Sequence, residues 1–268
     1  MLLPALGLLL VLPARADPYL LHDAGRPMPD TSPVALVVLD PGLAEPAVQA
    51  LVDGLEAEGL DAWILSFPPQ AQDTQAIVTR FIPQARANFP AHRPLALVGP
   101  GLGGTLAARA AKADPPAALA LLGAPLAPPR SELVSWLCAL PVPQGGLDLP
   151  SLGAVTWRDQ PVLPLLLGQP PPPLARVSAT WLRDLQGWAR QGDPVDLSAA
   201  TFPVWAGTGL LDELAPPEDL RPWLGEHPFV RFGYLRMDLH GYDHAALLRE
   251  ERVARVLARW LAQELAGG

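Results

Sequence analysis

Short runs of apolar residues recur along most of the chain. In the first five of them, polar residues do not alternate with the apolar ones, so both faces of each run are expected to be buried. Strands of a parallel sheet that is covered on both faces have this pattern. The runs that predict strands span residues 34–39, 62–65, 95–98, 118–122, 203–206 and 229–235.

Segments with apolar residues at helical spacing lie between these runs, as expected for amphipathic helices. Pro46 is placed to begin the first segment and Gly59 to end it, whereas Pro83 should kink or divide the second. The predicted helices span residues 46–59, 74–88, 102–112, 178–190, 217–224 and 245–265. This alternation predicts right-handed βαβ units, an α/β fold and a mostly parallel sheet. A ligand should then bind at the carboxyl ends of the strands.

The alternation stops in residues 125–200, which are rich in proline and tryptophan. We interpret this segment as a cap inserted over the edge of the sheet, with the core in residues 33–124 and 201–268. Residues 17–32 should form an extended lead-in. Trp181 and Trp188 fall on a predicted cap helix, where they either fill the core of the cap or line a ligand pocket.

The first twelve residues are almost entirely apolar and lead to Ala14-Arg15-Ala16, a small-residue cleavage pattern. Residues 1–16 therefore predict a secretory signal peptide, although a positively charged start is missing. An uncleaved anchor or a wrongly assigned start are the alternatives. Cleavage would give a periplasmic or secreted protein with no stable membrane span, because the apolar stretch is short for a bilayer.

Composition narrows the classes of partner. Half of the 268 residues are hydrophobic and 17% are charged, which indicates a globular chain. The net charge of −8 makes nucleic acid an unfavourable partner. Cys138 is the one cysteine, so neither an internal disulfide nor a redox pair is expected. His22, His92 and His227 lack the spacing of metal ligands, and we expect no metal and no cofactor.

The run at residues 95–98 continues into Gly99-Pro100-Gly101-Leu102-Gly103 and then into an alanine-rich helix. This strand, turn and helix match the frame of a nucleophile elbow, Gly-x-Ser-x-Gly, in which a sharp turn presents a serine. The nucleophile position is Gly101 here. Glycine has no side-chain atom that can attack a carbonyl.

The succession of elements resembles the α/β-hydrolase family over nearly the whole mature chain, closest to its lipase or acylhydrolase and polyhydroxyalkanoate-synthase-like branch. The segments that carry the resemblance are residues 37–43, 59–65, 99–103, 203–216 and 242–248. The resemblance implies an α/β-hydrolase-like sheet with an inserted cap and a site at the elbow.

Residue by residue, the resemblance implies that Asp212 is the acid and His244 the base of a triad. His240 is a rival for the base, because both histidines follow the last strand, and Glu213 is a rival for the acid. Ser66 and Thr105 lie near the expected site as weaker candidates for a relocated nucleophile.

Three positions depart from the family pattern: Pro41 replaces the histidine of its His-Gly pair, Pro100 precedes the nucleophile position, and Gly101 occupies it. Backbone donors survive side-chain replacement, so the N–H groups of Leu43 and Leu102 are expected to form an oxyanion hole. A pocket of this kind can hold a carbonyl or carboxylate without cleaving it.

Three functions follow as hypotheses. The first is an exported, non-catalytic protein that binds a small apolar or acyl-bearing ligand or a protein partner. The second is an ester or acyl hydrolase that uses Asp212 and His244 with activated water or a relocated nucleophile. The third is a structural subunit that docks on an exported protein through its proline-rich cap.

Overall fold

A computed structural model describes residues 19–24, 28–128, 131–224 and 234–267. Its centre is a seven-stranded sheet with the order β1-β3-β2-β4-β5-β10-β11. All neighbouring strands are parallel except β1, which pairs antiparallel with β3 at one edge. The strands are β1 (Leu20–Asp23), β2 (Val34–Val38), β3 (Asp61–Ser66), β4 (Leu95–Pro100), β5 (Ala118–Leu122), β10 (Val204–Gly209) and β11 (Tyr234–Leu239). The predicted α/β class and mostly parallel sheet are confirmed.

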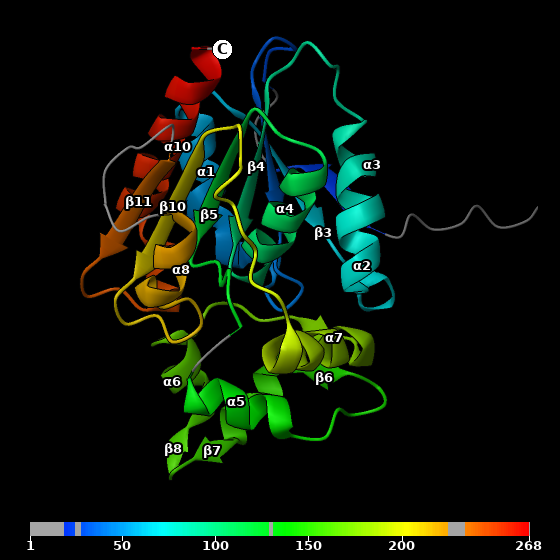
Figure 1. The fold of residues 1–268 in the computed structure, drawn as a ribbon, viewed down its shortest axis with the longest axis vertical. Helices are drawn as coiled ribbons and strands as arrows, with labels where there is room; N and C mark the ends of the chain where they lie inside the picture. The colour runs from blue at the N-terminus through cyan, green and yellow to red at the C-terminus, as the bar shows by residue number, and fades with distance from the viewer. Residues whose placement is uncertain (1–18, 25–27, 129–130, 225–233, 268) are drawn as a thin grey trace, which may run out of the picture.

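The inner strands are buried along their whole length because helices cover both faces of the sheet (Figure 1). On one face lie η1 (Glu45–Val48), α1 (Gln49–Ala57), α9 (His244–Arg249) and α10 (Glu251–Ala266). On the other face lie α2 (Thr74–Ala76), the π-helical turn η3 (Ile77–Phe81), α3 (Ile82–Arg86) and α4 (Leu102–Ala113). The short helices η2 (Pro69–Ala71) and α8 (Pro217–Leu224) complete the core. The continuous apolar runs are therefore the strands between two helical layers.

The segment that we interpret as a cap lies beyond the carboxyl ends of the parallel strands (Figure 1). It contains α5 (Glu132–Ala139), β6 (Leu147–Asp148), η4 (Leu149–Ala154), β7 (Thr156–Trp157), β8 (Gln160–Pro161), α6 (Val162–Leu167), β9 (Arg176–Val177) and α7 (Ala179–Gln191). Short antiparallel pairs, β6 with β9 and β7 with β8, hold it together. An isolated bridge between Leu43 and Leu174 joins it to the loop after β2.

Three elements differ from the expectation. The lead-in contains β1, an edge strand that the sequence analysis did not predict. The last strand begins at Tyr234, whereas most of the predicted run lies outside the described residues. The long C-terminal helix is divided at Glu250, whose side chain caps α10 by accepting from the N–H of Arg252.

The predicted signal peptide, residues 1–16, also lies outside the described residues. Among the helices that the structure describes, none combines the length and the apolar character needed to cross a bilayer.

Candidate functional site

The turn between β4 and α4 has the geometry that the sequence predicts for an elbow. Gly101 adopts φ +54° and ψ −137°, a conformation that a residue with a side chain rarely adopts. Its N–H donates to the carbonyl of Leu122 at 2.9 Å, which fixes the turn above β5. The helix then passes so close to β2 that a Cβ atom on Gly103 would lie 2.1 Å from the carbonyl oxygen of Val38. Glycine is therefore required by the close approach of the backbones.

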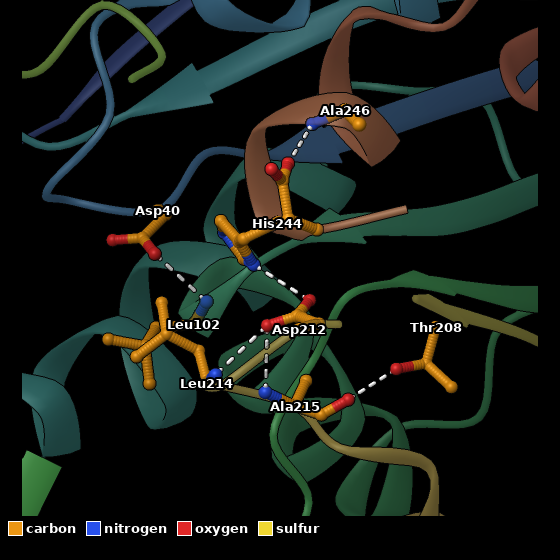
Figure 2. A network of polar contacts seen from close by, with 9 residues as sticks. Asp40, Leu102, Thr208, Asp212, Leu214, Ala215, His244 and Ala246 are labelled. Atoms are coloured by element: carbon orange, nitrogen blue, oxygen red, sulfur yellow. Dashed lines mark hydrogen bonds and ion pairs between the residues drawn. The ribbon is translucent and has the colours of Figure 1, made fainter. Parts of the chain in front are cut away.

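Asp212 and His244 meet beside this turn (Figure 2). Asp212 follows β10, and its Oδ1 accepts from the N–H groups of Leu214 and Ala215 at 2.9 and 3.0 Å. Its Oδ2 lies 3.0 Å from His244 Nδ1, and both side chains are almost fully buried. A Cβ atom on Gly101 would lie 3.4 Å from His244 Nε2, so the imidazole faces position 101. Asp212, His244 and the glycine of the elbow thus lie together at one edge of the sheet.

Asp40 is a third member of the site, and the sequence analysis missed it. It follows β2 and is 7% exposed. Its Oδ2 accepts from the N–H of Leu102 at 2.9 Å (Figure 2). Its Oδ1 accepts from the N–H of Gly42 at 2.7 Å. A Cβ atom on Gly101 would lie 2.8 Å from Asp40 Oδ2, closer than real Cβ contacts. The carboxylate therefore lies in the space that a side chain at residue 101 would enter.

The expected oxyanion hole is changed by this carboxylate. The N–H of Leu102 is present but is bonded to Asp40, and the N–H of Leu43 donates to the Asp40 carbonyl at 2.9 Å. The prediction that Leu43 and Leu102 are free donors is therefore wrong. The replaced positions Pro41 and Pro100 are both buried beside the turn.

The pKa values of Asp40 and His244 are both raised in the folded protein. Burial raises the pKa of the Asp40 carboxyl, although the N–H groups of Gly42 and Leu102 and the charge of His244 lower it. Burial alone would lower the pKa of His244, but the carboxylates of Asp212, Asp40 and Asp243 outweigh it, so that this pKa is raised. The Asp212 carboxylate thus stabilises the imidazolium form of His244, as the acid of an acid–base pair does.

The rival acid and base lie elsewhere. His240 and Glu213 are both exposed, whereas His244 and Asp212 are buried and bonded to each other. Their exposure is typical of solvated loop residues.

The two candidate hydroxyls have other partners. Ser66 donates to Glu45 Oε1 at 3.0 Å, and Thr105 donates to the carbonyl of Pro125 at 2.6 Å. Neither hydroxyl is bonded to His244. As for metals, no group of three potential ligands was found among the described residues, which leave out His227.

Trp181 and Trp188 lie on α7 and are 5% and 9% exposed. They face α4 across a cavity of about 30 Å³ that Leu102 and Thr105 also line. That volume is sufficient for one or two water molecules. The tryptophans thus act mainly as packing between cap and core.

The cap covers the site. A Cβ atom on Gly42 would lie 3.0 Å from the side chain of Leu149, and one on Gly168 would lie 2.0 Å from the carboxyl carbon of Asp243. His244 is 1% exposed as a result. Solvent therefore has almost no access to the three polar side chains.

Comparisons with known proteins give a fold. No protein-family model matches the sequence, and no curated protein matches it. Solved structures do match over nearly the whole chain. They include a monoacylglycerol lipase from Paleococcus ferrophilus (17% identity, 92% of this chain and 98% of that chain, TM-score 0.57), Est1E from Butyrivibrio proteoclasticus with ferulic acid bound (15%, 93% and 95%, 0.59), and a soluble variant of a monoglyceride lipase from Saccharomyces cerevisiae with a substrate analogue (14%, 93% and 91%, 0.61). The chain therefore has the α/β-hydrolase fold.

Proposed function

We propose that this α/β-hydrolase-fold protein does not form an acyl-enzyme and acts by binding. The observation that carries the proposal is the position of Asp40 Oδ2, 2.8 Å from where a side chain at residue 101 would begin. One carboxylate thus fills the space of a nucleophile and occupies the N–H of Leu102.

Acyl transfer at an elbow needs a nucleophile, a neutral base and free oxyanion donors. Gly101 supplies no nucleophile, and the N–H of Leu102 is occupied by Asp40. Loss of a single oxyanion donor typically slows such reactions about 10²–10³-fold. The two deficits act on the same step and reinforce one another.

The binding function is proposed for an exported protein whose first sixteen residues are a signal peptide. Its ligand is a small apolar or acyl-bearing molecule, or a protein partner that docks on the proline-rich cap. The apolar residues and prolines of the cap segment support the protein partner, whereas a small ligand needs more room than the cavity of about 30 Å³ beside Trp181 and Trp188.

The test is chemical labelling by a fluorophosphonate, which reacts with activated serines. We expect no labelling of the wild-type protein and little of Gly101→Ser, because the new Cβ would lie against Asp40 Oδ2. The double variant Gly101→Ser, Asp40→Ala frees both the space and the N–H of Leu102, and it should be labelled. Adding His244→Ala should abolish that labelling. Stoichiometric labelling of the wild-type protein would overturn the proposal.

A second candidate function is hydrolysis with Asp40 as the relocated nucleophile. The geometry around residue 101 favours it. A Cβ atom on Gly101 would lie 2.8 Å from Asp40 Oδ2 and 3.4 Å from His244 Nε2, so both groups face the same point. The carboxylate would attack the carbonyl carbon of an ester and form a mixed anhydride, while the alcohol oxygen departs with its electron pair and takes a proton from the imidazolium of His244. The neutral His244 left behind would then take a proton from water, which attacks the Asp40 carboxyl carbon of the anhydride, releases the acid of the substrate and restores Asp40.

Oxygen labelling distinguishes this candidate. A single turnover in ¹⁸O-water would place the label in the Asp40 carboxylate, as seen by mass spectrometry of the peptide that contains it. Asp40→Asn should also abolish turnover of nitrophenyl esters. Absence of turnover in the wild-type protein excludes the candidate for these substrates and agrees with the binding function.

A further inference from the structure

A groove lies on the face of the molecule formed by α10 and the end of the edge strand β11. Its enclosed part, about 250 Å³, lies between helix and strand. An open part of about 550 Å³ continues along the helix. We name the two parts together the α10 trough, and its principal residues are Met237, Leu239, Arg252, Arg255, Val256 and Trp260.

The floor of the trough is apolar. Val256 is 38% exposed, although it lies in the middle of an otherwise well-packed amphipathic helix. Trp260 follows one helical turn later and continues the same stripe. Met237 and Leu239 extend it onto the sheet edge. The trough thus offers a continuous apolar surface of the kind that marks ligand or partner sites.

Its rim is positively charged in a chain of net charge −8. Arg252, Arg255 and Arg259 lie three and four residues apart, so they share one side of α10. Arg259 is paired with Glu58 at 3.4 Å and still has a side chain that is 67% exposed. Over the ranges that the structure describes, no carboxylate partner is found for Arg252 or Arg255, and the latter donates only to the carbonyl of Glu251. Two guanidinium groups are thus available beside an apolar channel.

We propose that the α10 trough binds a free long-chain carboxylate, with the carboxylate on Arg252 and Arg255 and the alkyl chain running over Val256 into the enclosed part beside Met237 and Leu239. Guanidinium groups suit a carboxylate because they donate two parallel hydrogen bonds. The enclosed part favours an alkyl chain over a peptide helix, since a helix with its side chains is about 10 Å wide. The proposal does not depend on whether the Gly101 site is catalytic.

The test is calorimetric titration of the full chain with dodecanoate, kept below the concentration at which it forms micelles. Dodecanol and phosphatidylglycerol vesicles are separate arms. We expect saturable one-to-one binding of dodecanoate that is about tenfold or more tighter than that of dodecanol. The double variant Arg252→Gln, Arg255→Gln should remove this preference, whereas Arg183→Gln, an exposed arginine on α7, should not change it.

A second variant keeps the test informative if the arginine variants unfold. Val256→Asp places a charge on the exposed floor and should abolish binding, while its thermal unfolding shows that the fold is intact. No saturable binding, equal affinity for dodecanol, or binding to vesicles alone would each overturn the proposal. Fluorophosphonate labelling of the wild-type protein would overturn the proposed function and leave this inference intact.

Discussion

At the scale of single residues, Gly101 and Asp40 share a space that holds only one side chain. We therefore predict that Gly101→Ala destabilises the protein by about 2–3 kcal/mol, of which about 1 kcal/mol is the positive φ and the remainder is the contact with Asp40. Urea unfolding of the wild-type protein and of Gly101→Ala measures this loss of stability. Gly59→Ala is the matched control, because Gly59 has φ +82° and no atom within 4 Å of its would-be Cβ.

The excess over the control should disappear in an Asp40→Ala background, since the contact is then gone. Equal losses for the two glycines would show that the Asp40 carboxylate moves aside freely.

His244 gives the site a pH dependence. Its pKa is raised above the ordinary 6.5, mainly by Asp212 against the opposing effect of burial, so the folded protein holds this proton more tightly than the unfolded chain. Its contribution to stability is complete below pH 6.5 and is lost as the pH rises through the raised pKa. Asp40 acts in the same direction, because its pKa is also raised.

We expect the melting temperature of the wild-type protein to fall relative to that of His244→Gln as the pH rises above 6.5, the ordinary pKa of histidine. Scanning calorimetry across this range measures the difference. A constant difference would contradict the raised pKa.

At the scale of elements, the backbone of α4 packs directly against the sheet at its glycines. A Cβ on Gly103 would lie 2.1 Å from the Val38 carbonyl oxygen, so Gly103→Ala must push helix and strand apart. We predict a loss of about 2–4 kcal/mol in the free energy of unfolding, as for other overpacked backbone contacts. Gly187→Ala on α7, where nothing lies within 4 Å, should instead stabilise by about 0.5–1 kcal/mol. Denaturant unfolding of the two variants tests the contrast.

The elements that the sequence predicted well are those whose burial is complete. Residues 34–38 and 118–122 are apolar throughout because helices cover both of their faces. The edge strand β1 was missed because it is half exposed and carries His22 and Asp23, which interrupt any apolar run. At the other edge, β11 extends beyond the predicted run to Leu239, because its residues after Leu235 alternate between polar and apolar and do not form a continuous apolar run.

The candidate site was predictable in part. The resemblance to the α/β-hydrolase family implied Asp212 and His244, which the structure brings together. Asp40 was not predicted, because a buried carboxylate is stable only with donors around it. One of these, the N–H of Leu102, lies 62 residues away in the sequence.

The division of the C-terminal helix at Glu250 was missed because glutamate is not a typical N-cap.

At the scale of the whole molecule, the proposed export fixes where the mature chain starts. We predict that the protein, purified from the exported fraction of its native host, begins at Asp17, because a signal peptidase cleaves after Ala16 when small residues occupy positions 14 and 16. Intact mass and N-terminal sequencing are the measurements. A chain that retains residues 1–16 in that fraction would instead favour an uncleaved anchor.

Two contacts join the cap to α9, one at each end of this helix. The helix that begins with His244 touches the cap at both ends: Asp243 packs against Gly168, and Arg249 donates to the carbonyl of Gln169 at 3.2 Å. Movement of the cap away from the core would therefore strain both ends of α9, the short helix that carries His244. Occupancy of the cap by a ligand or partner and the orientation of His244 are thus mechanically linked, so each can report on the other.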